Sequence, residues 1–407
     1  MASELVVPVA SLKNLREHPN ASLLGLADVL GYQMVIPLAE DAAGTIIRRF
    51  KPGVRDERGQ RVPAEAGDVA EDVRFRFKYA EGQLVVYFPA DTLIPAEWAD
   101  KFGVRKFLKG KENDRVGRIR LRGEPSFGLV VDRPEGSTWK EGDNVADFYG
   151  AKKYEPPVWA TCGDAAPRDP LVDPFFDKFT DIQNGRIFVD VLKEGEEAIF
   201  TEKIHGTNCR IGIVDGKMVA GSMEVRRKRP FKKVGEAEAE CDFDSEEMKR
   251  STYWFPWTVK GVREMMESFR PAVGPNDPHN MHVILYGEVY GGSVQSLDYG
   301  IAKGKGIGFR VFGLRANGRF LDWDDLDKVC AQYGVKTVPV LWRGPFSMAK
   351  AKELADGIST MAGHIREGCV VYPVMEREDP KVGRAVLKFI GTEYELSKHK
   401  DADTKDV

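Results

Sequence analysis

Short alternations of apolar and polar residues, broken by Gly, Pro or Asp, fill the first third of the chain. The runs ELVVPVASL, GYQMVIPL, GQLVVYFPAD, GRIRLRG and SFGLVVD, which end near residue 131, are typical of strands. Several short strands joined by irregular loops predict a small β-barrel or sandwich. We therefore expect a strand-rich domain over residues 1–150.

A stretch rich in Pro, Gly, Asp and Lys begins near residue 132. Such composition is typical of surface loops and connections between domains. We expect a linker over residues 151–175 and a second domain over residues 176–407.

The pattern changes after residue 176, where strand-like runs alternate with a few helical ones. The runs EEAIFTEKIHG and NCRIGIVDGKMVAGS predict two strands and a hairpin with a turn at Asp215-Gly216. Helices are predicted over 259–269, over 323–333 with Asp322 as the N-cap, and after Ser347. The fold class is therefore α+β, with antiparallel sheets flanked by helices. The segment 229–280, which contains an acidic run, reads as an insertion.

Composition excludes several classes of protein. The chain has 407 residues, 42% hydrophobic and 30% charged, with a formal net charge of -3. No apolar run is long enough to span a membrane, and the N-terminus lacks the pattern of a secretion signal. The five cysteines are scattered and never form a C-x-x-C pair, which argues against a zinc site and favours a reducing cytoplasm.

Local charge is more informative than net charge. One basic stretch over residues 101–122 contains two phenylalanines, Phe102 and Phe107. A second lies over residues 226–233. Lys and Arg bind phosphates and exposed aromatic rings stack on bases, so both stretches are candidate nucleic-acid contacts. The alternative is a solvated charged face with the phenylalanines in the core. The candidate residues are Arg105, Lys106, Lys109, Arg118, Arg226 and Arg227.

The hexapeptide that starts at Lys203 and ends at Asn208 is the first candidate for chemistry. A lysine at the end of an apolar strand, beside a glycine turn, projects into a pocket with little hindrance. Lysine is a nucleophile only when neutral, so we expect the site to lower its pKa. The alternative is a surface lysine in a hairpin, since short motifs recur by chance.

Four further motifs follow in order: LYGEVYG from Leu285, FRVFGL from Phe309, REGCV from Arg366 and AVLKF from Ala385. With the Lys203 motif, they resemble motifs I, III, IIIa, IV and V of the covalent nucleotidyltransferases, the superfamily of DNA ligases, RNA ligases and mRNA capping enzymes. The resemblance covers residues 196–395.

The resemblance implies a role for each matching residue. Lys203 would attack the α-phosphorus of ATP and carry AMP, with Lys388 on the α-phosphate. Glu288 and Glu367 would hold the ribose and a divalent metal, Mg²⁺ or Mn²⁺. Glu202 would read the adenine edge. The implied catalytic residues are Lys203, Lys388 and Glu367.

Other residues would complete the nucleotide site. Phe312 and Val370 would stack on the two faces of adenine, while Phe309, three positions earlier, is expected in the core. His205 and Asn208 would contact sugar and phosphates, with a structural hydrogen bond as the alternative for His205. The implied nucleotide-binding set is Glu202, Lys203, His205, Gly206, Asn208, Glu288, Phe312, Glu367, Val370 and Lys388.

The ends of the chain favour one branch of the superfamily. Only residues 389–407 follow Lys388, which is short for the C-terminal domain of DNA ligases and capping enzymes. Residues 1–131 resemble the N-terminal OB domain of one family of ATP-dependent RNA ligases, and the segment GTEYEL fits the same family. We therefore expect an OB-like barrel followed by a ligase-type adenylyltransferase domain.

The expected substrate is RNA with 3′-OH and 5′-phosphate ends, such as a nicked duplex, and the expected protein is a cytoplasmic monomer active in RNA repair. Two positions depart from the family pattern: Val386 stands where a basic residue is common, and Met223 follows Ser222 where arginine is usual. Arg226 or Arg227 would then serve instead. The alternatives are a DNA ligase, a capping-type enzyme, or a degenerate protein that binds RNA ends.

Overall fold

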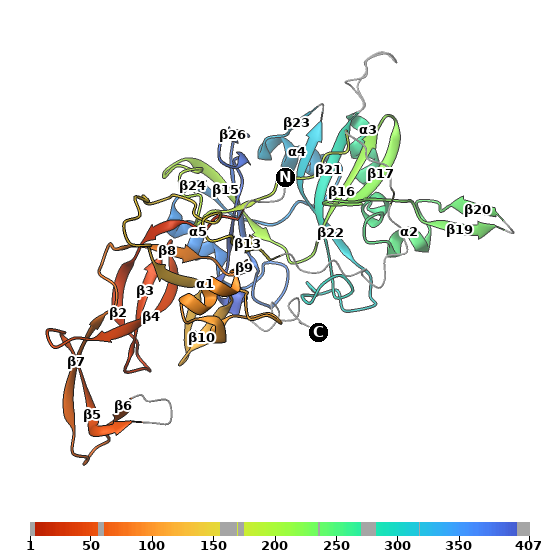
Figure 1. The fold of residues 1–407 in the computed structure, drawn as a ribbon. Coiled ribbons are helices and arrows are strands. Elements are labelled where there is room, and N and C mark those ends of the chain that lie inside the picture. The colour runs from red at the N-terminus through yellow and green to blue at the C-terminus, as the bar shows by residue number, and fades with distance from the viewer. Residues whose placement is uncertain are drawn as a thin grey trace. The chain divides into compact units, whose positions relative to one another are not determined.

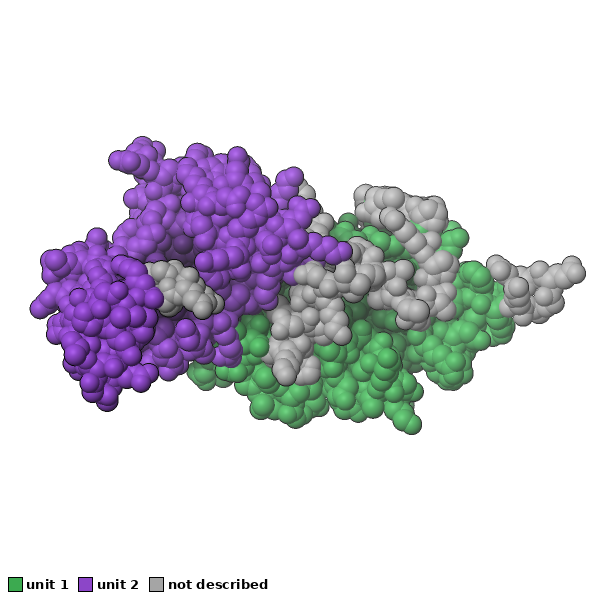
Figure 2. All heavy atoms as spheres, turned by 60° about the horizontal axis from the view of Figure 1, so that its bottom comes forward, with its two compact units in different colours: residues 1–3, 157–405 green, residues 4–156, 406–407 purple. Residues whose placement is uncertain are grey.

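The computed structural model describes residues 5–55, 61–154, 169, 175–234, 237–269, 282–316 and 318–396. The chain divides into two compact units, coloured in Figure 2: unit 2, mainly residues 4–156, and unit 1, mainly residues 157–405. Most of the expected linker lies outside the described residues. No helix in the described part of the chain is long and apolar enough to cross a membrane.

A three-stranded sheet forms the centre of unit 2. Its strands β1 (Val9–Ser11), β8 (Leu84–Phe88) and β12 (Leu129–Asp132) pair antiparallel, with β8 in the middle. The run LVVYF is apolar throughout, and four of its five residues are buried. Val86 and Phe88 pack against Ala99 of helix α1 (Ala96–Lys101), which closes this core.

A six-stranded sheet carries the rest of unit 2. Its order is β2 (Lys13–Glu17), β3 (Leu24–Val29), β4 (Tyr32–Glu40), β7 (Glu71–Phe77), β5 (Ile46–Arg55) and β6 (Arg61–Pro63). The alternation of GYQMVIPL appears in β4, where Tyr32, Met34 and Ile36 are buried. The turn from β3 to β4 uses Leu30 and Gly31, both at positive φ, as a tight hairpin requires.

Smaller elements complete unit 2. These are β9 (Thr92–Leu93), η1 (Arg105–Phe107), β10 (Arg118–Leu121), β11 (Glu124–Phe127) and β13 (Lys152–Lys153). Lys152–Lys153 falls inside the expected linker and pairs with β9. The predicted strands are present, but none of the sheets among residues 5–154 closes on itself, so a closed OB-like barrel is not found.

Unit 1 contains two larger sheets (Figure 1). The five-stranded sheet has the order β14 (Gln183–Asn184), β28 (Leu387–Ile390), β25 (Gly368–Pro373), β15 (Glu197–Lys203) and β24 (Val340–Pro345). The six-stranded sheet has the order β18 (Arg226–Arg227), β17 (Lys217–Ser222), β16 (Thr207–Val214), β21 (Val283–Tyr290), β22 (Gly308–Ala316) and β23 (Arg319–Phe320). Both sheets are antiparallel except where β14 pairs with β28, so the predicted α+β class is confirmed.

Helices and short hairpins flank these sheets. They are β19 (Phe231–Val234), β20 (Ala237–Glu240), α2 (Glu246–Arg250), η2 (Phe255–Thr258), α3 (Val262–Ser268), α4 (Trp323–Gln332), α5 (Met348–Ala355), β26 (Glu378–Asp379), β27 (Gly383–Arg384) and α6 (Thr392–Leu396). The three predicted helices are α3, α4 and α5. Ser347 caps α5 by accepting a hydrogen bond from the Lys350 amide at 3.0 Å. Asp322 lies at the N-cap of α4, but its carboxylate accepts from the Glu376 amide instead.

Alternation along β15 assigns its side chains to two different cores. Ile199 packs with Val370 and with residues of the six-stranded sheet such as Ile211. Phe200, on the opposite face, packs with Ala351 and other residues of α5. Because alternate residues of a strand point the same way, Lys203 shares the face of Ile199. The pattern therefore aims Lys203 toward the six-stranded sheet.

Candidate active site

Lys203 is the last residue of β15, and two glycines let neighbouring strands come close to it. It pairs with Gly368 of β25, where an added Cβ would lie 2.1 Å from the Phe389 carbonyl oxygen. At Gly206, an added Cβ would lie 2.3 Å from the Val289 carbonyl oxygen. Both glycines therefore act by permitting close approach of the backbone.

The ammonium of Lys203 forms an ion pair with Glu367, with Nζ 2.6 Å from Oε1. Burial acts to lower the pKa of Lys203, but the carboxylates of Glu367 and Glu288 raise it by more, so its pKa lies above the ordinary value. The expectation of a lowered pKa is therefore wrong for the ligand-free protein. The charges that act on Lys203 there are two carboxylates.

The pKa values of Glu367 and Glu288 are shifted in opposite directions. Burial would raise the pKa of Glu367, but Lys203 and His205 hold it well below its ordinary value. Burial raises the pKa of Glu288 to about 8, and the charge of Glu367 adds to the rise while Lys203 opposes it.

Asn208 and Glu288 lie opposite each other on β16 and β21, and Arg310 of β22 lies opposite Glu288. Directly paired residues point to the same face of a sheet. The Oδ1 of Asn208 is buried and has no hydrogen-bond partner among the described residues. Since buried polar atoms are nearly always paired, this oxygen marks a place for a donor from outside the chain.

His205 is buried and held from three sides. Its Nδ1 lies 3.0 Å from the Tyr394 hydroxyl and its Nε2 lies 3.2 Å from Oγ of Ser296. Its backbone amide donates to the Tyr299 hydroxyl at 2.7 Å. The Nδ1 is also 3.6 Å from Oε2 of Glu367. These contacts fix the orientation of the ring beside the Lys203–Glu367 pair.

Glu202 is 1% exposed and uses only one of its carboxylate oxygens within the described structure. Its Oε2 accepts from the amide of Thr360 at 2.8 Å and from the hydroxyl of Thr360 at 2.7 Å. Its Oε1 is buried and has no partner among the described residues. The side chain is therefore a fixed acceptor that requires a donor.

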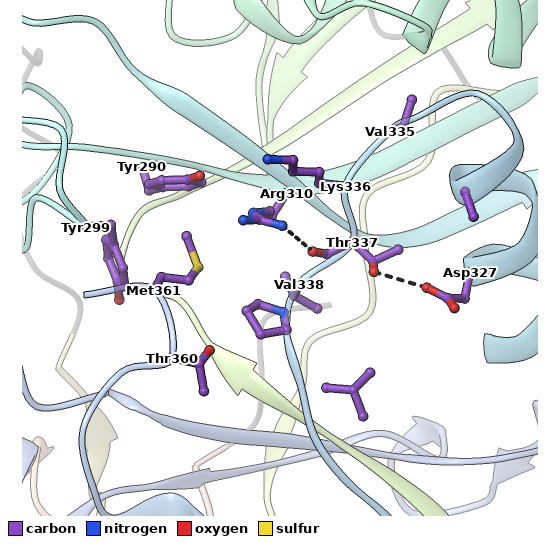
Figure 3. A pocket seen from close by; sticks show the side chains of 13 residues that line it. Tyr290, Tyr299, Arg310, Asp327, Val335, Lys336, Thr337, Val338, Thr360 and Met361 are labelled. Carbon is purple, nitrogen blue, oxygen red and sulfur yellow. Dashed lines mark hydrogen bonds between the residues drawn. The ribbon is translucent and has the colours of Figure 1, made fainter. Parts of the chain in front are cut away.

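A cavity of about 660 Å³ adjoins these groups (Figure 3). Thr360, which holds Glu202, lines it together with Tyr299, which holds His205. Arg310 reaches into it and donates to the Thr337 carbonyl oxygen at 3.3 Å. The volume is in the range of pockets that hold small ligands. None of the predicted nucleotide-binding residues lines the cavity itself, which borders the side chains that hold Glu202 and His205.

Lys388 and Val370 reach the same face as Lys203. Lys388 pairs with Val370, and Val370 pairs with Thr201 on β15, so all point to the Lys203 face. Val370 is buried between the two sheets. Phe312 is half-buried and contacts Phe179 edge to face, with ring centroids 4.7 Å apart.

Phe309 lies in the core of unit 1, as its spacing from Phe312 predicts. A Cβ added at Gly287 would lie 2.3 Å from the Phe309 ring, so the ring fills the space left by that glycine. The stacking roles of Phe312 and Val370 remain predictions.

The carboxylates fit a divalent cation as a partial ligand set. Among the described residues, no group of three or more His, Cys, Asp and Glu side chains is placed to hold a metal. Glu288 and Glu367 are nevertheless close enough for the charge of one to raise the pKa of the other. Mg²⁺ is commonly bound by one or two carboxylates, with water and phosphate oxygens as its other ligands. The residues present are compatible with that mode.

The candidate nucleic-acid contacts differ in how much charge they have available. Arg226 lies 3.1 Å from the partly buried carboxylate of Asp169, and Arg227 stacks over the ring of Tyr253. In unit 2, Arg105 pairs with Asp100 at 2.8 Å and Arg118 pairs with Asp91 at 3.0 Å.

The remaining candidates, Lys106 and Lys109, lie near the same surface. The Nζ of Lys106 lies over the Phe107 ring. The backbone of Lys109 pairs with that of Arg115 in an isolated antiparallel β-bridge. Phe102 packs against the core of unit 2, whereas Phe107 is 50% exposed. The core reading therefore holds for Phe102, and base stacking by the exposed Phe107 stays a prediction.

Several residues of the site carry no signal in the sequence. Ser296, Tyr299, Thr360 and Tyr394 lie between 91 and 189 positions from the residues that they hold. A hydroxyl at such a distance cannot be assigned to a partner from spacing. Only Tyr394 falls in a segment, GTEYEL, that the sequence pointed to.

Comparisons with known proteins agree with this geometry. Residues 196–390 match the family described as RNA ligase. A comparison with curated proteins found no match to this chain. Its fold resembles that of Naegleria gruberi RNA ligase. An apo mutant of that enzyme has a TM-score of 0.66 at 18% identity and covers 97% of this chain and 99% of its own.

Two further structures of the Naegleria gruberi enzyme give similar values. The form with PPi has a TM-score of 0.65 at 19% identity, covering 98% of this chain and 99% of its own. A mutant with ATP and Mn has a TM-score of 0.65 at 19% identity, covering 98% and 100%. These likenesses show a shared fold. The family match confirms the prediction of an RNA ligase domain of the nucleotidyltransferase type.

Proposed function

We propose, from the premise that residues 196–390 are an RNA ligase domain, that this chain uses ATP to join RNA ends through AMP bound covalently to Lys203. One observation carries the proposal. The amine of Lys203 lies within a group of carboxylates, next to buried acceptors that have no partner among the described residues, and a cavity of about 660 Å³ borders Thr360 and Tyr299, which hold Glu202 and His205. ATP supplies donors for those acceptors and a phosphorus atom for the amine. Structures of the similar Naegleria gruberi enzyme contain ATP and Mn.

In the first step, Nζ of Lys203 attacks the α-phosphorus of ATP. A P–N bond forms, the bond from the α-phosphorus to the bridging oxygen breaks, and pyrophosphate leaves with that electron pair. Lys203 must first lose its proton, and Glu367, whose Oε1 lies 2.6 Å from Nζ, positions the amine. Lys388, on the same face, stabilises negative charge on the α-phosphate.

Glu288 and Glu367 would hold a divalent cation, Mg²⁺ or Mn²⁺. When bound, such a cation supplies positive charge that offsets both carboxylates and favours the neutral form of Lys203. Burial raises the pKa of Glu288 to about 8, and a cation held there would favour the ionised form of this carboxyl group.

Glu202 would select adenine. Its Oε1 is buried and has no partner among the described residues, so it would accept a hydrogen bond from the exocyclic amine of adenine. Guanine presents a carbonyl oxygen at the equivalent position, and two acceptors repel each other. Phe312 and Val370 would stack on the base, while His205 and Asn208 would contact the sugar and phosphates.

Two further transfers complete the reaction. An oxygen of the RNA 5′-phosphate attacks the adenylyl phosphorus, the P–N bond breaks and Lys203 regains its amine. The 3′-OH of the other end then attacks the 5′-phosphate, and AMP leaves as the phosphodiester forms. Unit 2 would act as an OB-type clamp on the RNA, together with Arg226 and Arg227. The substrate would be a nicked duplex, as in RNA repair.

Sealing assays on a set of nicked duplexes test this function. The strands on the two sides of the nick are RNA or DNA in every combination, with ATP or GTP as the nucleotide and Mg²⁺ or Mn²⁺ as the metal. We expect sealing with ATP and an RNA 3′-OH strand. Equal sealing of all-DNA nicks would indicate a DNA ligase, and nucleotide transfer from GTP alone would indicate a capping-type enzyme.

A further inference from the structure

A groove in unit 2 combines positive charge with aromatic rings, and we propose that it binds an unpaired RNA strand. The groove encloses about 1420 Å³, and all the residues that line it belong to unit 2 and lie within the described ranges. The inference rests on the proposed function, because the strand it names is an unpaired extension of the RNA substrate, beyond the nicked duplex that is sealed.

Four cations that line the groove have no carboxylate partner among the described residues: Lys101, Arg120, Arg122 and Arg133. Arg120 and Arg133 donate only to backbone carbonyl oxygens, those of Gly123 and Trp139. Their charges are therefore available to an anion.

The arginines singled out by the sequence differ from these four. Arg105 and Arg118 are already paired with aspartates, and neither lines the groove. An aspartate offsets the charge of each of these two arginines. The groove thus contains cations whose charge is not offset by an ion pair among the described residues.

Aromatic rings form one wall of the groove. The rings of Trp98 and Phe102 are stacked, with centroids 5.6 Å apart, and Phe148 lies 5.8 Å from Trp98. The buried Tyr149 contacts both Trp98 and Phe148 edge to face, at 4.8 and 4.9 Å. The Nζ of Lys101 lies 4.6 Å from the Trp98 ring. Tyr149 thus holds the rings of Trp98 and Phe148 in place, and Lys101 adds a positive charge beside them.

Exposure of the rings indicates that something covers them in use. Phe148 is 53% exposed and Phe107 is 50% exposed, and both line the groove. Exposed apolar surface in a concave site is typical of a binding site. Cations for phosphates and flat rings for bases are the two features by which proteins hold single strands.

The same features exclude other occupants. The bases of a duplex are stacked on one another, so only its phosphates would reach the groove. An acidic peptide would use the cations but gives no reason for a wall of exposed rings. The occupant is therefore a strand whose bases are unpaired.

Binding measurements with the full-length protein test this assignment. Fluorescence anisotropy would report the affinity for a labelled oligouridine of about 12 nucleotides, for an abasic strand with the same backbone, and for an RNA duplex. For Phe148→Ala we expect affinity for oligouridine to fall about fivefold or more, since each stacked base contributes appreciably to binding. Affinity for the abasic strand should not change.

Removing charge should act on both single strands. For the double variant Arg120→Ala and Arg122→Ala we expect affinity about tenfold lower and a salt dependence shallower by about 1.4 in log–log slope, from two lost phosphate contacts. Arg76→Ala, which removes an arginine of unit 2 that is paired with Asp41 and lies outside the groove, and Phe231→Ala, which removes an exposed ring in unit 1, are the matched controls.

Three results would overturn the assignment: equal affinity of Phe148→Ala and Phe231→Ala for oligouridine, equal affinity of the wild type for the abasic strand and oligouridine, or tighter binding of duplex than of single strand. Formation of the AMP adduct is measured on the same proteins. A wild type that binds oligouridine as expected but forms no adduct would refute the proposed function and leave the groove assignment standing.

Discussion

Thr360 binds one oxygen of Glu202 with both its amide and its hydroxyl, at 2.8 and 2.7 Å, and leaves the other oxygen without a partner among the described residues. This arrangement fixes which way the carboxylate faces. The side chain next to the candidate nucleophile is thus a pure acceptor with a defined direction.

Replacing Glu202 with Gln should put a hydrogen-bond donor where Glu202 presents a free acceptor. The two Thr360 donors would hold the amide oxygen, so the NH₂ group would take the place of the free acceptor. We expect adduct formation with ATP to fall about 10- to 100-fold, in line with the cost of mismatched buried hydrogen-bonding groups, and the preference for ATP over GTP to shrink. Glu264→Gln, at an exposed position of α3, is the control. An unchanged nucleotide preference would refute the reading of adenine by Glu202.

Replacing Gly206 with Ala should damage the site through packing. The new Cβ would lie 2.3 Å from the Val289 carbonyl oxygen and 2.9 Å from Cγ of Glu288, so β21 must shift. We expect a loss of stability of about 1–3 kcal/mol and a larger relative loss of adduct formation. At Gly363 a Cβ meets nothing within 4 Å, so Gly363→Ala should behave as wild type in melting and adduct assays. Equal effects of both substitutions would contradict this account.

Deleting residues 1–150 should separate the two activities. The main hydrophobic clusters of unit 1 contain no residue from this segment, so we expect the remaining chain to fold and to form the AMP adduct at the wild-type rate. Nick sealing should fall at least about tenfold, since the proposed phosphate contacts are lost. The two rates are measured on one preparation. Unimpaired sealing would rule out a clamp role for unit 2.

The ion pair between Glu196, just before β15, and Arg377 makes the stability of unit 1 depend on pH in the acid range. Burial opposes ionisation of Glu196, but two hydrogen bonds from Arg377 and one from the Lys193 amide hold its pKa below the ordinary 4.5. A lowered pKa gives stability that is present above pH 4.5 and lost as the pH falls through the folded-state value.

Glu196→Gln should therefore lower stability by about 1–2 kcal/mol at neutral pH, with a difference from wild type that shrinks in acid. Urea midpoints at a series of pH values measure it, with the exposed Glu194→Gln as control. A difference that persists unchanged below pH 4.5 would show that the charge of Glu196 is not the cause.

Local patterns in the sequence predicted much of unit 1. The Asp215-Gly216 turn joins β16 to β17, with both residues at positive φ, because these residue types tolerate that conformation. The helix after Ser347 begins where the hydroxyl can cap it. Such features depend on neighbours in sequence, so the sequence alone contains them. The closed barrel expected for residues 1–131 depends on which strands pair at long range, and the described strands pair in open sheets.

The site was predictable to a similar extent. Motif order identified Lys203 and Glu367, and the structure brings them to 2.6 Å. The direction of the pKa shift of Lys203 was not predictable, since it depends on how two carboxylates and a buried amine are placed in space. The contacts of Thr360 and Tyr299 with the site were not predictable either, because both residues lie in loops far along the chain from their partners.

The most direct test of the account is whether the protein, incubated with labelled ATP and Mg²⁺ or Mn²⁺, becomes covalently labelled at Lys203. We expect one AMP per chain, stable to denaturation and located at Lys203 by peptide mass spectrometry. Lys203→Ala should not be labelled but should still bind RNA. The control Lys217→Ala, at an exposed position of β17, should be labelled normally. Labelling that persists in Lys203→Ala, or that maps to another residue, would contradict the account.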